Sequence, residues 1–209
     1  MHLNKKPEIE AVVFDLGKVL IDYDFERVLQ KVSRGATLTP SEIRLRLLSS
    51  DFFFDFECGR ISEREFHEKI QRSLNHSVGF DDFCDIWNSI FTQVISPTME
   101  IFLEFRSRPN LKTGILSNTN VLHFTYLQQR MDFLNEKKHV FASHEIRCRK
   151  PDAESFNFIL KEMDVSAQKT VFIDDLAENI QAAQALGIHG IHATDVHAVR
   201  TGLTALGLL

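Results

Sequence analysis

Four short segments, far apart in the chain, carry residue types that could transfer a phosphoryl group. They are Asp15 within Phe14-Asp15-Leu16-Gly17, the run Ser117-Asn118-Thr119-Asn120, the pair Lys150-Pro151, and the pair Asp174-Asp175. A carboxylate can attack phosphorus and carry the phosphoryl group as an aspartyl phosphate, which makes Asp15 the natural nucleophile. Adjacent carboxylates repel each other unless a cation compensates. The acidic pair together with Asp15 therefore predicts a Mg²⁺ site.

The remaining polar residues suit the phosphate itself. Lys150 could neutralise phosphate oxygens in the transition state, and Ser117 and Asn118 could donate hydrogen bonds to the same oxygens. Each signal alone also has an ordinary explanation, namely a capping acid, a solvated lysine or a side-chain-stabilised turn. Their common placement favours a site, because three of the segments end predicted parallel strands, whose carboxyl ends meet at one crevice.

Short apolar runs alternate with helical patterns in the second half of the chain. Buried strands are predicted at residues 11–14, 113–116, 140–142, 170–173 and 188–193. Helices are predicted at residues 99–105, 153–163 and 177–186, the last one ended by Gly187. Five strands alternating with helices imply an α/β fold, with a doubly wound parallel sheet and right-handed crossovers.

Residues 22–95 show a helical pattern throughout. Thr39-Pro40-Ser41-Glu42 combines a cap, a first-turn proline and a capping-box carboxylate. Ser62 with Glu65 repeats the capping signal, and after Gly79 the residues Phe83, Trp87, Ile90 and Phe91 follow at helical spacing. We expect a bundle of four or so helices inserted after the first strand. The chain then divides into a catalytic core of residues 1–20 and 97–209 and a helical cap of residues 21–96.

Phenylalanine is concentrated in this insertion, which holds nine of the eighteen in the chain. The run Asp51-Phe52-Phe53-Phe54-Asp55-Phe56 is too dense for one helix face. Its rings face the active site or another subunit, or they form a buried turn, and the sequence leaves these alternatives open. We hypothesise that Phe53 and Phe54 roof the pocket and exclude water. His123 is either a surrogate acid or a structural histidine.

Composition restricts the class of partner. The net charge of −5 and the lack of a Lys/Arg block favour a small phosphorylated molecule over nucleic acid or a membrane surface. Met1 to Glu10 lacks an apolar signal core, and no apolar run approaches the ~20 residues of a membrane span. We expect a cytoplasmic protein, a monomer or weak homodimer. Cys58, Cys84 and Cys148 read as incidental thiols.

The order Phe-Asp-Leu-Gly, Leu-Ser-Asn-Thr-Asn, Arg-Lys-Pro and Phe-Ile-Asp-Asp resembles the haloacid dehalogenase superfamily over nearly the whole chain. The helical insertion sits where the small cap of its subfamily I lies. The resemblance implies a Rossmann-like core with strand order 5-4-1-2-3. It also implies these roles: Asp15 as nucleophile and metal ligand, Gly17 as a ligand through its backbone carbonyl, Asp175 as direct ligand, Asp174 as ligand or supporting acid, Ser117 and Asn118 as phosphate-binding residues, and Lys150 as the charge-neutralising lysine.

Gly17 departs from the phosphatase pattern of this superfamily, which has an acid/base aspartate at that position. General acid–base catalysis by such a residue typically raises the reaction rate by about 10²–10⁴-fold. Three explanations compete: a leaving group that needs little protonation, such as a sugar 1-phosphate; a 2-haloacid dehalogenase; or a non-catalytic phosphate-binding module. The acidic pair argues against the dehalogenase, which uses no magnesium. A receiver domain is excluded by the motif order, because receivers carry the acid pair at the first strand.

The chain is also similar to the α-glucose-1-phosphatase type, which begins Asp-Leu-Gly as well. The shared features are Asp22, Asp24 and the segment Gly59-Arg60-Ile61-Ser62. This similarity implies a Mg²⁺-dependent phosphatase. We expect it to hydrolyse a small, sugar-phosphate-like phosphomonoester through an aspartyl phosphate on Asp15.

Overall fold

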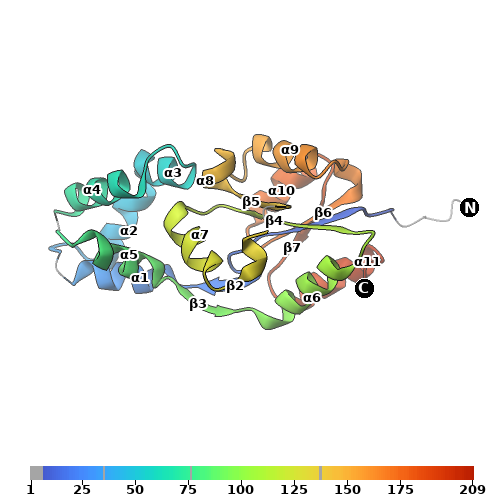
Figure 1. The fold of residues 1–209 in the computed structure, drawn as a ribbon, viewed down its shortest axis with the longest axis horizontal. Coiled ribbons are helices and arrows are strands. Elements are labelled where there is room, and N and C mark those ends of the chain that lie inside the picture. The colour runs from blue at the N-terminus through green and yellow to red at the C-terminus, as the bar shows by residue number, and fades with distance from the viewer. Residues whose placement is uncertain (1–6, 35, 76, 137) are drawn as a thin grey trace, which may run out of the picture.

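A five-stranded parallel sheet with the order β5-β4-β1-β6-β7 forms the centre of the protein (Figure 1). The computed structural model describes residues 7–34, 36–75, 77–136 and 138–209, so residues 1–6 of the polar amino-terminal segment lie outside the described residues. The sheet confirms the predicted α/β class. It also confirms the predicted strand order 5-4-1-2-3, in which only the five strands of this sheet are counted in chain order and the sheet is followed from β7 to β5. Its strands are β1 (Ala11–Phe14), β4 (Lys112–Ser117), β5 (Val140–Ala142), β6 (Thr170–Asp174) and β7 (His189–His192).

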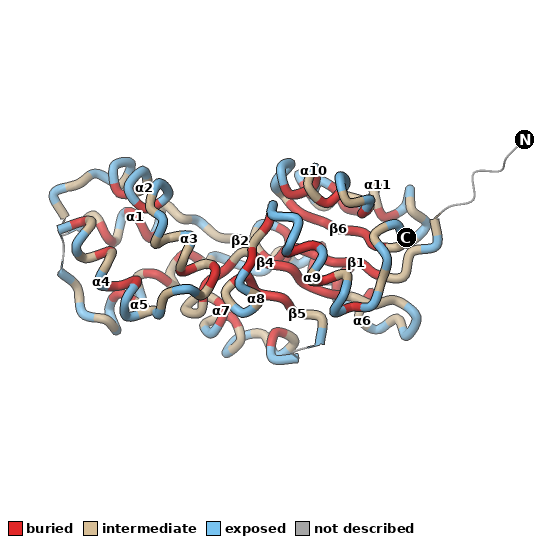
Figure 2. The backbone as a smooth tube through the Cα atoms, turned by 90° about the horizontal axis from the view of Figure 1, so that it is seen from above, coloured by how far each residue is buried: buried red, intermediate tan, exposed pale blue. Residues whose placement is uncertain are grey.

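Helices cover both faces of this sheet. Alternation along β1 sends Val12 and Phe14 to one apolar core and Ala11 and Val13 to the other. The tube in Figure 2 shows β1 and β6 as buried strands in the interior of the molecule. The first core is shared with α6 (Ser96–Ser107), α7 (Val121–Gln128) and α11 (Val196–Ala205), and the second with α9 (Ala153–Glu162) and α10 (Ala177–Ala185). Short connections are α8 (Ser143–Ile146), η1 (Asp132–Leu134) and η2 (Ala167–Lys169).

Two of these helices, α7 and α11, were not predicted from the sequence. In α7, Val121 and Leu122 pack against the core of the inserted helices, whereas Phe124 and Leu127 belong to the core of the sheet. A helix that contacts two cores has no single apolar stripe, so its periodicity is weak. In α11, β-branched residues and Gly202 lower the intrinsic helix propensity.

The insertion after β1 carries its own apolar core, centred on Phe66, Phe83 and Trp87. In the described residues it contains α1 (Phe25–Ser33), α2 (Pro40–Leu48), α3 (Asp51–Glu57), α4 (Glu63–Leu74) and α5 (Phe80–Asn88). The capping box of Thr39 with Glu42 is present, and the Ser62 side chain accepts a hydrogen bond from the Glu65 backbone. The predicted helix starts are therefore confirmed.

The prediction of helix throughout residues 22–95 is wrong at both ends of the insertion. There the chain forms an antiparallel ribbon of β2 (Ile21–Tyr23) and β3 (Phe91–Val94), with Ile21 opposite Val94. Helix α5 ends at Asn88, so Ile90 and Phe91 do not continue it. The segment that leads into the insertion and the segment that leads out of it lie side by side. Their backbone groups form hydrogen bonds with each other instead of within a helix.

The end of α3 is fixed against the sheet core at Gly59. This residue has φ +63°, and a Cβ there would lie 2.1 Å from the His144 carbonyl oxygen. Next to it, the buried Ser143 hydroxyl donates to the Glu57 carbonyl at 2.6 Å and accepts from the Thr119 N–H at 2.9 Å. This contact holds one part of the insertion over the end of the sheet. The division into residues 21–96 and the rest stays a prediction.

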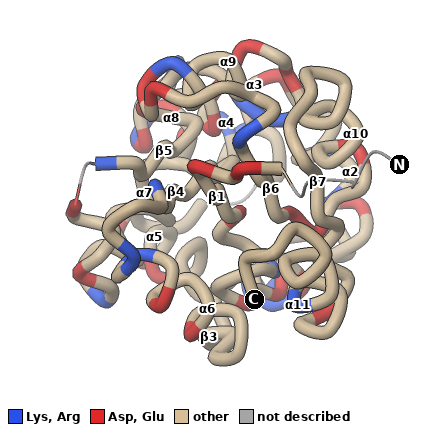
Figure 3. Tube along the Cα trace, turned by 90° about the vertical axis from the view of Figure 1, so that its right-hand side faces the viewer, with Lys and Arg blue, Asp and Glu red and all other residues tan. Residues whose placement is uncertain are grey.

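Charged residues are scattered along the part of the chain visible in Figure 3, where short Lys and Arg segments are separated by Asp, Glu and uncharged residues. No helix among the described residues is both long and apolar enough to cross a membrane. Cys58, Cys84 and Cys148 are free thiols, as predicted.

Candidate active site

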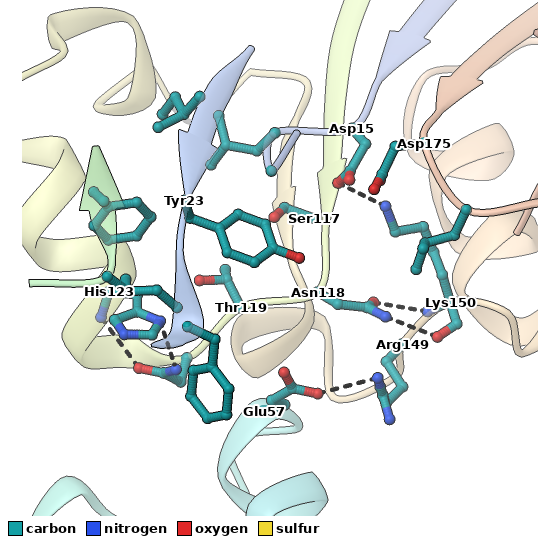
Figure 4. Close-up of a pocket in the computed structure, with 18 of the residues that line it drawn as sticks. Asp15, Tyr23, Glu57, Ser117, Asn118, Thr119, His123, Arg149, Lys150 and Asp175 are labelled. Carbon is teal, nitrogen blue, oxygen red and sulfur yellow. Dashed lines mark hydrogen bonds and ion pairs between the residues drawn. The ribbon is translucent and has the colours of Figure 1, made fainter. Parts of the chain in front are cut away.

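The strand ends bring the predicted acidic residues together. Phe14 of β1 pairs with Ile173 of β6, and the Asp15 N–H donates to the Ile173 carbonyl at 2.8 Å. Asp15 therefore lies directly beside Asp174. On the other side Phe14 pairs with Ile115 of β4, which ends at the buried Ser117 (Figure 4). All four sequence segments meet at this edge of the sheet.

Lys150 joins two of the carboxylates. Its Nζ lies 2.7 Å from Asp15 Oδ1 and 2.7 Å from Asp174 Oδ2, and its side chain is 1% exposed. Burial opposes the charge, but the two carboxylates outweigh burial and hold the pKa of Lys150 above its ordinary value. The site therefore contains a fixed positive charge beside the predicted nucleophile.

Asn118 holds the backbone of Lys150 in place. Its Nδ2 donates to the Lys150 carbonyl at 2.8 Å, and its Oδ1 accepts from the Lys150 N–H at 2.9 Å. The assignment of Asn118 as a phosphate-binding residue stays a prediction, and the contact that the structure shows is the one to the Lys150 backbone. A side chain at the end of β4 thus sets the position of the lysine that follows β5 and α8.

The two adjacent aspartates lie in different surroundings. Asp174 is fully buried and accepts hydrogen bonds from Lys150, from the Leu176 N–H at 2.8 Å and from Asn179 Nδ2 at 3.0 and 3.1 Å. Asp175 is partly exposed and faces Asp15 in Figure 4. Sequence reasoning missed Asn179; its position in the first turn of the helix after the acidic pair was the only signal.

These carboxylates fit a divalent cation. Asp15, Asp174 and Asp175 each offer an oxygen atom within 4.8 Å of the others. Burial raises the pKa of Asp15 to about 7, although Lys150 opposes the rise, and Asp174 adds to it. Burial and Asp174 also raise the pKa of Asp175. A cluster of hard oxygen donors whose ionisation is unfavourable without a cation matches Mg²⁺. Both oxygens of Asp174 already accept hydrogen bonds, whereas Lys150 contacts Asp15 through Oδ1, so Asp15 and Asp175 are the better candidates to bind the cation.

Tyr23 lies against Gly17 in the same pocket. A Cβ at Gly17 would lie 2.8 Å from Tyr23 Cε1, so the tyrosine ring occupies the space of any side chain there. Burial, followed by the charges of Asp175 and Asp15, raises the pKa of Tyr23 to about 12, which keeps the phenol protonated. Figure 4 shows its hydroxyl pointing into the pocket. No sequence pattern singled Tyr23 out.

The residues that flank Tyr23 have structural contacts. Asp22 Oδ1 lies 2.6 Å from Lys18 Nζ, and this contact lowers the pKa of Asp22. Asp24 caps α1 by accepting a hydrogen bond from the Glu26 N–H at 2.9 Å. Asp22 and Asp24 thus make local contacts at the ribbon and at the start of the first helix.

His123 has the contacts of a structural histidine. One ring nitrogen lies 3.1 Å from Asn120 Nδ2, and the other lies 3.1 Å from the Trp87 carbonyl oxygen. Burial lowers the pKa of His123 to about 4, so the ring is neutral. With Nε2 donating to the carbonyl and Nδ1 accepting from the amide, neither nitrogen has a proton for a leaving group. Of the two alternatives in the sequence, the geometry supports the structural one.

A cavity of about 370 Å³ extends from the carboxylates to the inserted helices. Phe53 and Phe54 line it, as does an ion pair of Arg149 with Glu57 at 3.2 Å. The Arg149 guanidinium lies over the Phe54 ring at 4.7 Å. Of the open alternatives for the phenylalanine run, rings facing the site are observed for these two, whereas Phe56 is buried in the helical core. Arg149 and Glu57 were missed by sequence reasoning.

Comparisons with known proteins agree with this geometry. Residues 9–187 match the family model described as haloacid dehalogenase-like hydrolase. The D-ribitol-5-phosphate phosphatase of Bacteroides thetaiotaomicron is 25% identical over 187 residues, which cover 86% of this chain and 89% of that protein. The sesquiterpene phosphatase of Aspergillus oryzae is 50% identical over 56 residues, only 27% of this chain and 29% of that protein.

A solved structure resembles the whole arrangement. It is a haloacid dehalogenase (HAD) family enzyme from Bacteroides thetaiotaomicron, in complex with magnesium and inorganic phosphate. Its TM-score is 0.76 at 27% sequence identity, and the match covers 87% of this chain and 92% of that chain.

Proposed function

The chain belongs to the haloacid dehalogenase-like hydrolase family, and we propose that it is a Mg²⁺-dependent phosphatase acting on a small phosphomonoester. One observation carries this proposal: Lys150 Nζ lies 2.7 Å from both Asp15 and Asp174, with Asp175 beside them. A nucleophile, a fixed cation and a carboxylate pair at one strand edge are the parts that phosphoryl transfer requires.

Each residue has a distinct role in the proposed reaction. Asp15 attacks phosphorus and forms an aspartyl phosphate while the P–O bond to the alcohol breaks and the leaving oxygen takes up a proton; water then attacks phosphorus, the bond to Asp15 breaks, and inorganic phosphate leaves. Lys150 and Ser117 bind phosphate oxygens, and Asn118 holds the Lys150 backbone. Asp15, Asp175 and the Gly17 carbonyl would hold Mg²⁺, with Asp174 supporting Lys150. When bound, Mg²⁺ supplies a positive charge that stabilises the negative charge developing on the phosphoryl oxygens.

The hydrogen-bond donor for the leaving oxygen is Tyr23 in this proposal. Its ring fills the space above Gly17, and its neutral hydroxyl points into the pocket. A phenol is a weaker acid than the carboxylic acid it replaces, but it can donate a hydrogen bond to a developing alkoxide. Tyr23 would therefore supply the hydrogen bond to the leaving oxygen that an aspartate at position 17 would otherwise supply.

The names of the relatives support hydrolysis of a phosphate ester and differ in the alcohol. The Bacteroides enzyme is named for a sugar alcohol phosphate, which agrees with the sugar-like substrate predicted from the sequence. The Aspergillus enzyme is named for a sesquiterpene. The phosphate end of the substrate is what the two names share.

Phosphate release tests the proposal directly. A panel of p-nitrophenyl phosphate, sugar phosphates, nucleotides and alkyl phosphates is assayed with Mg²⁺ or EDTA, for the parent and for Asp15→Asn. We expect Mg²⁺-dependent release that Asp15→Asn abolishes. Asp81→Asn, an exposed carboxylate on α5, is the matched control and should retain activity.

The alternatives give different results in the same experiment. Chloride release from a 2-haloacid without metal indicates the dehalogenase. Binding of phosphorylated ligands without turnover, in parent protein that binds Mg²⁺, indicates a non-catalytic module. No phosphate release from any substrate, with both variants folded by circular dichroism, contradicts the phosphatase.

A further inference from the structure

We propose that the alcohol part of the substrate is a hydrocarbon rather than a sugar. This inference rests on the proposed phosphatase function and specifies its substrate class. It is drawn from the half of the cavity that lies beyond the phosphate site, between the sheet edge and the inserted helices (Figure 4).

The walls of this half are mostly apolar, although Arg44, Glu57, His123 and Arg149 also line the cavity. The apolar walls are contributed by separate elements: Ile21 from β2, Phe25 from α1, Phe53 from α3, Trp87 from α5, Phe91 from β3 and Leu127 from α7. The rings of Phe25 and Phe53 lie against Trp87 with centroids 6.1 and 6.3 Å apart. Such a lining favours apolar ligands, because binding buries their apolar surface against the walls and removes it from water.

Several polar groups near these walls are already engaged within the protein, whereas Trp87 Nε1 and Arg149 Nε are buried without a hydrogen-bond partner among the described residues. Both nitrogens of His123 are bonded, to Asn120 and to the Trp87 backbone. Arg44 is paired with Glu26 at 3.1 Å. A sugar would have to bring several hydroxyl groups into this space, and most of them would lose water without gaining a free partner among the apolar walls. A hydrocarbon has no such requirement.

Apolar side chains remain exposed around this cavity. Leu176, which is 46% exposed, lines it next to Asp175. On the side of the inserted helices, Leu48 is 44% exposed and Phe54 is 37% exposed, and both line the cavity. A phosphorylated hydrocarbon that reaches this side would cover Leu48 and Phe54 while its phosphate remains beside Lys150. The cavity of about 370 Å³ falls within the roughly 300–1,000 Å³ of pockets that enclose small organic ligands.

The test compares substrates of matched size. Cyclohexyl phosphate is paired with glucose 1-phosphate, and geranyl phosphate with ribitol 5-phosphate, all with Mg²⁺. We expect kcat/KM at least tenfold higher for the hydrocarbon member of each pair. Benzyl phosphate is a further arm, which separates an aromatic alcohol from an isoprenoid one. Equal or higher kcat/KM for the sugar members overturns the inference and leaves the phosphatase function standing.

Variants of Leu48 and Phe54 locate the effect. Leu48→Ser combined with Phe54→Ser should raise KM for geranyl phosphate at least fivefold. Leu45→Ser is the matched control, because Leu45 lies on the same helix, is 71% exposed and does not line the cavity. A change of KM in the control equal to that in the double variant contradicts the assignment of this wall to the substrate.

Binding separates failure of this inference from failure of the proposed function. The parent and Asp15→Asn are titrated with geranyl phosphate and ribitol 5-phosphate by calorimetry at two temperatures. Tighter binding of geranyl phosphate with a negative heat-capacity change supports the apolar site, even if nothing is hydrolysed. Equal affinities overturn the inference whether or not phosphate is released.

Discussion

The ring of Tyr23 occupies the space beside Gly17 in which phosphatases of this family usually carry an acidic side chain. A Cβ added at Gly17 would lie 2.8 Å from Tyr23 Cε1 and 3.3 Å from its Cδ1. Both carbons belong to a ring held between the ribbon and the site. The Tyr23 ring in this position and a side chain at position 17 cannot both occupy this space. The absence of the aspartate and the position of the tyrosine therefore go together.

Gly17→Ala should destabilise the protein by about 1–3 kcal/mol, as overpacking of a filled site does. The measurement is the free energy of unfolding in denaturant. Gly79→Ala is the control, because the nearest atom to a Cβ there lies at 3.6 Å. Adding Tyr23→Ala to Gly17→Ala should show a favourable coupling of about 1 kcal/mol or more. Strict additivity would contradict the steric relationship.

Tyr23→Phe keeps the ring and removes the donor. We expect kcat for alkyl phosphates to fall by roughly 10²-fold, the lower end of the range for acid–base groups. Hydrolysis of p-nitrophenyl phosphate should change much less, because nitrophenolate leaves without help from a donor. Steady-state kinetics over a series of leaving groups measures this difference. An equal loss for all leaving groups would assign Tyr23 to packing alone.

Lys150→Met should lower the free energy of unfolding by about 3–5 kcal/mol, because it leaves two buried carboxylates without their cation. It should also abolish phosphate release. Lys169→Met is the control: Lys169 is 39% exposed and paired with Glu8 and Glu10, and loss of such a solvent-screened surface pair should change the free energy of unfolding far less. Equal effects of the two variants on unfolding would contradict the role of Lys150 as a buried bridge.

Stabilisation by Mg²⁺ should increase with pH. The pKa of Asp15 is raised from 3.8 to about 7 by burial, so between these values the folded protein holds a proton that the unfolded chain releases. Stability of the metal-free protein from this group is therefore greatest at low pH and falls as pH rises toward 7. A cation that replaces this proton removes the free-energy cost of ionising Asp15. It therefore stabilises the folded protein most at the upper end of this pH range.

Thermal melts with Mg²⁺ and with EDTA, at several values between about pH 5 and 8, measure this effect. The difference in Tm should grow with pH in the parent. It should grow less in Asp15→Asn, which cannot ionise at this position. A difference that is flat or that shrinks with rising pH would contradict the assignment.

The sequence by itself determined the sheet, its strand ends and the identity of the chemical groups. Each strand appears as a short apolar run, and Asp15, Ser117 and Asp174 lie at or directly after their ends. Because parallel strands end at the same edge, local patterns were enough to predict that these residues meet. The four segments also identified the family before any fold was known, and the match to residues 9–187 confirms it.

Only the tertiary structure decided how these groups are divided among tasks. Asp174 and Asp175 are adjacent in sequence, yet Asp174 is bonded to Lys150 and Asn179 whereas Asp175 is free to face the pocket. Tyr23 reaches Gly17, and aromatic rings from four elements form the apolar wall, through contacts between distant segments. Such contacts depend on packing in three dimensions, which the spacing of residues along one strand or helix does not record.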